Sequence, residues 1–150
     1  MIDLAGKPVT LRSARAEAWV NVGSEIATRL REEGGLAKGN VLETARVAGI
    51  VAAKRTPELI PMCHPLVLDV VEVDAQVMED RVRIVSRVTC EGKTGVEMEA
   101  MIAASVAALT VYDMVKSAEK GIQIGPVRLL EKEGGKSGHW KREENRHAAG

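Results

Sequence analysis

The chain lacks phenylalanine and has few aromatic residues of any kind, which make up 2% of its 150 residues. Because 45% of the residues are hydrophobic, the core must be built from aliphatic side chains. Basic and acidic residues number 21 each, so no net charge draws the chain toward DNA or a membrane surface. Basic residues are not interleaved with aromatic ones, as a surface that stacks single-stranded bases requires. We therefore expect neither a nucleic-acid nor a membrane partner.

Cysteine is also scarce, and Cys63 and Cys90 do not form a C-x-x-C pair, so a structural zinc site is not supported. Residues 1–7 lack the basic region and apolar core of a secretory signal. We therefore expect a cytoplasmic protein with both thiols reduced. The length predicts a single domain over residues 1–150, in which 139–150 form a polar tail with the composition of a mobile segment.

Hydrophobic periodicity predicts the order strand, helices, strand, strand, helix, strand. The expected elements are a strand at 14–22, a helix at 24–33 capped by Ser24, a helix to about residue 54 capped by Asn40, a hairpin of 71–77 and 82–90, a helix at 95–119 and a strand at 126–131. This order is that of an α+β, ferredoxin-like βαββαβ domain with an extra helix in the first crossover. We expect an antiparallel sheet with helices packed on one face.

Three of the five prolines fall within residues 54–66. Because each proline fixes its own φ and disfavours helix in the residue before it, we expect a stiffened loop here. This loop carries Met62, Cys63 and His64, and His64 is the only histidine outside the polar tail. A preset loop that presents an imidazole indicates a site rather than packing.

No residue from Ala100 to Tyr112 is charged, and thirteen residues are too few to span a bilayer, which takes about 20. A helix that is apolar nearly all round must be buried on most sides, whereas a small sheet covers only one flank. We therefore infer a subunit interface and a homo-oligomer. Small residues along this helix would allow a second helix to pack closely against it. They are Ala103, Ala104, Ser105, Ala107 and Ala108.

Charged residues stand at both ends of the same helix. Glu97 fits a capping box with Thr94, and this interpretation is as good as a catalytic one. Glu99, two residues further on, has no such structural role. Asp113 stands at the other end of this helix, fourteen residues after Glu99, which places the two residues roughly 21 Å apart along the helix. If both are functional, the site must be shared between subunits.

Asp113 is followed at the i+3 position by Lys116. The structural interpretation is an ion pair that contributes about 0.2–0.5 kcal/mol. The functional interpretation is a general acid/base pair, in which the ammonium lowers the carboxylate pKa. Spacing alone favours the structural interpretation.

Two fragments resemble parts of a Walker A motif, Gly92-Lys93-Thr94 and Gly135-Lys136-Ser137, but the required earlier glycine is absent from both. The chain is therefore not a P-loop NTPase. Most other lysines are expected to be solvated surface. Lys38 and Lys136 stand on glycine-rich loops and are the better candidates for contacts with a phosphorylated small molecule.

Several long blocks occur in an order that is specific enough to name a family. They are residues 38–46, 48–50, 52–56, 59–66, 92–100, 103–110, 112–114, 124–130 and 134–138. With these blocks, the chain closely resembles the cyclic pyranopterin monophosphate synthases, the molybdenum cofactor biosynthesis protein C family. The resemblance extends from Ile2 to Gly138, whereas the tail beyond Gly138 matches nothing diagnostic, and His139 is interpreted as part of that tail.

The resemblance implies conversion of 3′,8-cyclised 7,8-dihydro-GTP to cyclic pyranopterin monophosphate and pyrophosphate. It also implies a hexamer, a trimer of dimers, with sites shared between subunits. No cofactor would be required, although Mg²⁺ could arrive with the triphosphate. Ring opening, ring closure and attack of a ribose hydroxyl on the α-phosphate need positioned proton donors and acceptors and neutralised phosphate charge.

By position, the resemblance implies catalytic roles for Asp113 and Lys116 in proton transfer. It implies that His64 and Glu99 orient the base and sugar and that Lys38 contacts phosphate. The other implied substrate-binding residues are Met62, Cys63, Met98 and Glu97, and Lys136 is added as a substrate-binding candidate because of its glycine-rich loop.

Three rival functions stay open at this point. A nucleotide-sensing module would bind without turnover, and small ferredoxin-like domains suit such a role. A generic cyclase would release pyrophosphate from ordinary GTP. A purely structural scaffold would make replacement of Asp113 or His64 inconsequential for any ligand.

Overall fold

The computed structural model describes residues 1–143. Its elements are β1 (Thr10–Asn21), α1 (Ser24–Glu33), β2 (Gly35–Leu36), β3 (Gly39–Asn40), α2 (Val41–Ala53), α3 (Thr56–Leu59), β4 (Val70–Met78), β5 (Arg81–Gly92), α4 (Glu97–Val115), β6 (Gln123–Glu133) and β7 (His139–Lys141). The predicted hairpin, the helix at 24–33 and the Asn40-capped helix are confirmed, and Asn40 Oδ1 accepts a hydrogen bond from the Glu43 N–H.

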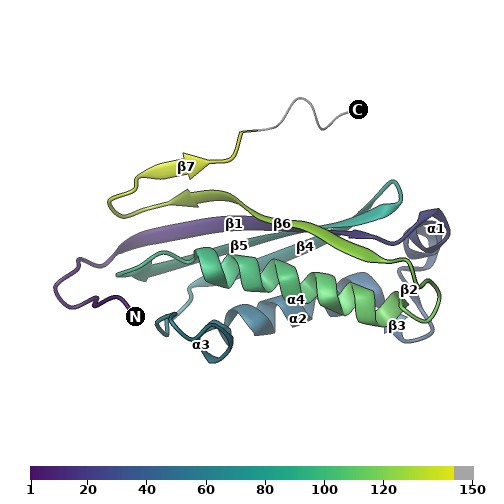
Figure 1. The fold of residues 1–150 in the computed structure, drawn as a ribbon, viewed down its shortest axis with the longest axis horizontal. Coiled ribbons are helices and arrows are strands. Elements are labelled where there is room, and N and C mark those ends of the chain that lie inside the picture. Colours follow the sequence, from purple (N-terminus) through teal and green to yellow (C-terminus); the bar gives the residue numbers. More distant parts are fainter. Residues whose placement is uncertain (144–150) are drawn as a thin grey trace.

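Five strands form one antiparallel sheet in the order β4-β5-β1-β6-β7, and β2 and β3 form a small separate ribbon. α2 and α4 lie side by side against one face of the sheet, whereas α1 lies at its end (Figure 1). The four long strands have the order β4-β5-β1-β6, which is that of a ferredoxin-like βαββαβ domain. The predicted fold class is therefore confirmed, with α1 as the additional helix of the first crossover.

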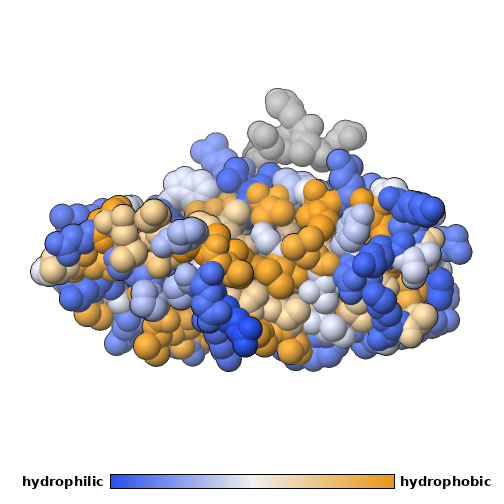
Figure 2. Space-filling view, turned by 60° about the horizontal axis from the view of Figure 1, so that its bottom comes forward, coloured by the Kyte–Doolittle hydropathy of each residue, from blue (hydrophilic) through white to orange (hydrophobic). Residues whose placement is uncertain are grey.

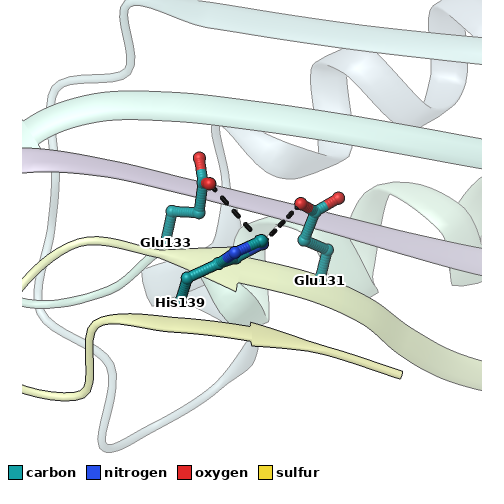
Figure 3. Close-up of side chains that lie close together, drawn as sticks. All are labelled: Glu131, Glu133 and His139. Carbon is teal, nitrogen blue, oxygen red and sulfur yellow. Dashed lines mark hydrogen bonds and ion pairs between the residues drawn. The ribbon is translucent and has the colours of Figure 1, made fainter. Parts of the chain in front are cut away.

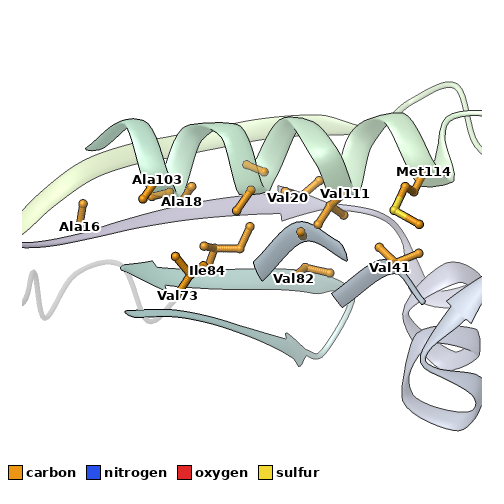
Figure 4. Packing of buried hydrophobic residues seen from close by; sticks show 14 of the residues in the cluster. Ala16, Ala18, Val20, Val41, Val73, Val82, Ile84, Ala103, Val111 and Met114 are labelled. Atoms are coloured by element: carbon orange, nitrogen blue, oxygen red, sulfur yellow. The ribbon is translucent and has the colours of Figure 1, made fainter. Parts of the chain in front are cut away.

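The core lies between the sheet and the two long helices (Figure 4). Ala14, Ala16, Ala18 and Val20 alternate along β1 and are each at most 1% exposed. Because successive strand residues point to opposite faces, this alternation places one complete face of β1 against the helices. Small side chains on this face allow α4 to pack close to the sheet, so the core is thin and aliphatic.

The small residues of α4 serve a contact within the chain rather than between chains. Ala103, Ala104, Ala107 and Ala108 are fully buried. A Cβ added at Gly49 of α2 would lie 2.8 Å from the Ala103 carbonyl oxygen, so the two helices approach closely at this point. The prediction that these alanines form a subunit interface is therefore wrong, because α2 of the same chain packs against this side of α4. α4 is long and apolar enough to cross a membrane, but half of it is buried inside this domain.

The proline-rich segment 54–66 is only partly a loop. Residues Thr56–Leu59 form the short helix α3, with Pro57 in its first turn. A proline is tolerated there because the first N–H groups of a helix have no intrahelical partner. A loop follows from Ile60 to the start of β4, as predicted, and it begins with a turn in which the Cys63 N–H donates a hydrogen bond to the Ile60 carbonyl oxygen.

Two predicted helix caps are wrong. Gly23 rather than Ser24 precedes α1, and Val96 rather than Thr94 precedes α4, with no side-chain cap at either position. α4 also ends at Val115 rather than near Glu119. Glu97 is thus the first residue of its helix and is free for contacts outside it.

The tail begins with a strand rather than with a mobile segment. β7 pairs with the end of β6 across the loop at 134–138, with His139 opposite Glu133. β7 was not predicted because it pairs with Glu131–Glu133 of β6, and the predicted strand ended at residue 131. The rest of the predicted tail, residues 144–150, lies outside the described part of the chain.

Candidate active site

A small cavity lies at the beginning of α4 and has a volume of about 170 Å³. It brings together six of the predicted site residues, namely Met62, Cys63, His64, Glu97, Met98 and Glu99. The first three come from the loop after α3 and the others from the first turn of α4. Ile2, Leu4 and Lys7 of the N-terminal segment, together with Thr94 and Gly95, complete its wall.

Glu99 is the most unusual group in this cavity. The residue is only 4% exposed, and its Oε2 atom has no hydrogen-bond partner among the described residues. Burial raises the pKa of its carboxyl group, and the nearby charge of Glu97 raises it further. An unpaired buried carboxyl that borders a cavity is costly for stability, which is typical of a group reserved for a ligand.

The loop residues provide a thiol and an imidazole beside this carboxyl. Burial and the charge of Glu99 both raise the pKa of the Cys63 thiol. Cys63 is therefore held as a thiol rather than as a nucleophilic thiolate. A neutral thiol and an imidazole can donate or accept hydrogen bonds, so this loop is suited to orienting a polar heterocycle.

A second, larger pocket of about 460 Å³ adjoins the first. The two pockets share Lys7, Thr94, Gly95 and Glu97. Basic side chains dominate the larger pocket, namely Lys7, Arg12, Lys93, Lys132 and Lys136. This excess of cations over the single carboxylate of Glu97 makes the pocket suitable for a polyanion such as a phosphate chain.

The loop at 134–138 is held directly against this pocket. Gly134 and Gly135 both have positive φ angles, and a Cβ added at Gly134 would collide with the backbone carbonyl oxygen of Leu11. Glycine is therefore required for the close approach that places Lys136 beside Arg12. Arg12 Nε and Thr10 Oγ1 are buried and have no hydrogen-bond partner among residues 1–143.

Glu97 does not cap its own helix. Its Oε1 atom lies 3.1 Å from Lys132 Nζ of β6. This ion pair joins the wall of the smaller cavity to the basic side chains of the larger pocket. Glu97 is therefore not a helix cap, and its side chain is available to the two pockets that it lines.

A separate cluster lies at the opposite end of α4. Lys116 Nζ is 3.0 Å from Asp113 Oδ1, and Lys38 Nζ is 3.3 Å from Asp113 Oδ2. Lys38 also donates a hydrogen bond to the Asp113 carbonyl oxygen at 3.1 Å. The hydrogen bond from Lys116, followed by that from Lys38, lowers the pKa of the Asp113 carboxyl. Because two ammonium groups contact one exposed carboxylate, the cluster carries a net positive charge. It therefore contains one cation more than the predicted i,i+3 ion pair of Asp113 and Lys116.

The two groups of residues do not meet within one chain. Glu99 and Asp113 lie on the same unbroken helix, fourteen residues apart, which corresponds to roughly 21 Å at about 1.5 Å per residue. The structure therefore places Lys38, Asp113 and Lys116 together and away from the cavity residues. Lys38 lies beside Asp113 and does not line the larger, basic pocket.

Between these two ends, α4 presents an apolar stripe to solvent. Met98, Leu109 and Tyr112 are exposed on α4, and Val47 and Val51 are exposed on the neighbouring α2. Figure 2 shows hydrophobic side chains spread across this helical face. Leu109 is the most exposed of these five side chains, at 57%.

Sequence reasoning missed part of the basic pocket. Lys7 and Arg12 were not singled out, and Lys93 was considered only as part of an incomplete Walker motif. They converge because β1, the end of β5 and the loop after β6 meet at the same end of the sheet. Residue type alone carries no signal for such a convergence, although the glycine pair at 134–135 indicates a close approach.

The fold and its pockets define a ferredoxin-like α+β domain in which a polar cavity adjoins a basic pocket. Residues 1–135 match the model of the MoaC family, and the chain therefore belongs to the MoaC family. This finding confirms the resemblance seen in the sequence. It gives the chain a role in molybdenum cofactor biosynthesis, in a family known for cyclic pyranopterin monophosphate synthase.

Proposed function

We propose that this protein is a cyclic pyranopterin monophosphate synthase, a phosphorus–oxygen lyase. Its substrate would be (8S)-3′,8-cyclo-7,8-dihydroguanosine 5′-triphosphate, and its products cyclic pyranopterin monophosphate and pyrophosphate. The observation that carries this proposal is the pairing of two adjoining pockets. One offers an unpaired buried carboxyl beside Cys63 and His64, and the other offers five basic side chains.

The two pockets suit the two parts of this substrate. A guanine-derived ring system presents hydrogen-bond donors and acceptors that Glu99 and His64 can bind. A triphosphate needs the charge neutralisation that Lys93, Lys132 and Lys136 offer. Among residues 1–143, Glu97 is the only carboxylate that lines the larger pocket, and it is already paired with Lys132. A Mg²⁺ ion would therefore be held by phosphate oxygens of the substrate rather than by a protein site.

Asp113 and Lys116 are proposed to perform proton transfer, with Lys38 holding Asp113 in place. Asp113 is ionised over the neutral range, because an aspartate already titrates well below pH 7 and the two lysines lower its pKa further. In the proposed mechanism, a second subunit brings this cluster over the cavity of the first. The exposed apolar stripe of α4 and α2 supports such an assembly, which we propose to be a hexamer built as a trimer of dimers. We propose that the enzyme acts in the cytoplasm.

The test is pyrophosphate release, with fluorescence detection of the oxidised pterin, from the cyclised dihydro-GTP and from plain GTP. Turnover of the cyclised nucleotide alone is the expected result. Turnover of GTP itself would replace the proposal by a generic cyclase. Binding of either nucleotide without turnover would replace it by a sensor.

A further inference from the structure

Three side chains of metal-binding types meet on the hairpin formed by β6 and β7 (Figure 3), and none of the three lines either pocket. His139 of β7 is the cross-strand partner of Glu133, and Glu131 precedes Glu133 by two residues on β6. Residues at i and i+2 of a strand, and direct cross-strand partners, share one face of a sheet. One ligand atom from each of these three residues lies within 4.8 Å of the others.

Two carboxylates converge on a single imidazole nitrogen. His139 Nε2 lies 2.7 Å from Glu131 Oε1 and 3.5 Å from Glu133 Oε1. A histidine ion pair needs only one carboxylate, and two carboxylates of like charge repel each other unless a cation lies between them. Two carboxylates and one imidazole that converge in this way form a donor set that a shared cation could use.

The surrounding residues support such a site. Arg15 Nη1 of β1 lies 3.3 Å from Glu131 Oε2, the oxygen that faces away from the imidazole. This contact fixes the carboxylate and leaves Oε1 directed at His139, which is the arrangement that outer partners of metal ligands usually provide. The side chains of His139 and Glu133 are about half exposed, at 50% and 55%, so an ion can reach them from solvent.

We propose that Glu131, Glu133 and His139 bind one divalent first-row transition ion, of which Zn²⁺ is the representative. One imidazole and two carboxylates suit Zn²⁺, Ni²⁺ or Cu²⁺, whereas Mg²⁺ prefers oxygen ligands alone. Water would complete the coordination, because these side chains provide only three ligands. The site belongs to this hairpin and takes no part in the proposed chemistry.

The ion would act as a clip across the hairpin. β7 has only three residues and pairs with β6 alone, so few contacts anchor it. The loop between the two strands carries Lys136 and Ser137 of the basic pocket. A bond from β6 through the ion to His139 would close this loop at its base. The consequence for substrate binding rests on the proposed function, but the metal site itself does not.

Titration of the chelator-treated, full-length protein with ZnCl₂ in a calorimeter tests the site without any substrate. We expect one Zn²⁺ per chain, with affinity reduced about tenfold or more in His139→Ala and in Glu133→Gln. The matched control is His64→Ala, which removes the histidine beside Cys63 and should keep the wild-type affinity. Circular dichroism of each variant checks that it is folded.

Three results would overturn the site, namely no Zn²⁺ binding, equal affinity in His139→Ala, or loss of binding in His64→Ala. Hydrogen exchange tests the clip separately. Zn²⁺ should slow amide exchange in β7 of the wild type and not of His139→Ala. Zn²⁺ binding with unchanged exchange in β7 would reject the clip.

Discussion

The two ends of α4 carry carboxyl groups in opposite environments. Glu99 is buried without a partner and its pKa is raised, whereas Asp113 is exposed between two lysines and its pKa is lowered. Environments that push two carboxyl pKa values apart are typical of groups with different roles in proton transfer. Yet one helix separates them by roughly 21 Å. We propose from this comparison that each end is half of a site and that the other half comes from another copy of the chain.

The largest effect is expected at the exposed end. Asp113→Asn should lower turnover about 10²–10⁴-fold, because it removes the proposed general base. Its free energy of unfolding should change little, since the side chain is about half exposed. Pyrophosphate release and urea unfolding measure the two quantities. Asp74→Asn, an exposed aspartate on β4, is the matched control and should keep full activity. Full turnover by Asp113→Asn would remove this residue from the mechanism.

The second prediction concerns the apolar stripe that joins the two ends. Leu109→Glu should weaken subunit association by about 2 kcal/mol or more, because it places an unpaired charge in the proposed interface. Sedimentation should show smaller species, and turnover should fall with them. Met78→Glu changes another exposed apolar residue, at the end of β4, and should leave the assembly intact. An unchanged mass for Leu109→Glu would show that the stripe is not the interface.

The third prediction separates the basic pocket from the catalytic cluster. Lys136→Ala should raise KM about tenfold to a hundredfold, as expected for loss of one charged hydrogen bond, and should change kcat less. High salt should reduce the difference from the wild type. Lys120→Ala, beyond the end of α4 and outside both pockets, is the control. An equal KM for Lys136→Ala and Lys120→Ala would argue against phosphate binding in this pocket.

The smallest effect is expected on stability at the buried end. The folded-state pKa of Glu99 lies above its unfolded value of 4.5, so the folded state binds the proton more tightly. The stability of the wild type should therefore fall as pH rises from 4.5 to the folded pKa, by about 1.4 kcal/mol for each unit of difference.

Glu99→Gln removes this ionisation and should be more stable than the wild type at pH 8 by about 1 kcal/mol. It should also lack this part of the pH dependence. Urea unfolding at pH 4.5 and pH 8 measures both effects. A pH dependence that is the same in the variant and the wild type would mean that Glu99 is not the group responsible.

Much of the fold could be predicted because it depends on the local periodicity of apolar residues along the chain. The alternation of β1 and the hairpin of β4 and β5 follow directly from which residues are apolar. Features that depend on tertiary partners could not be predicted in this way. The alanines of α4 indicated a partner helix correctly, but nothing local shows that the partner is α2 of the same chain.

The same distinction holds for the site. The loop with Cys63 and His64 and the two ends of α4 were found from residue type and position. The capping role of Glu97 was wrong because its true partner, Lys132, lies on a distant strand. Lys7 and Arg12 were missed for the same reason, since only the folded sheet brings them to Lys136.

The central claim, a site shared between subunits, is tested most directly by mixing two inactive variants. Glu99→Gln and Asp113→Asn chains would be dissociated, combined in equal amounts and reassembled. In a dimer of one chain of each kind, one shared site keeps both wild-type carboxyl groups, so random pairing predicts recovery of roughly a quarter of wild-type turnover. Activity no higher than that of the separate variants, in a sample whose mixed assembly is verified, would contradict the shared site.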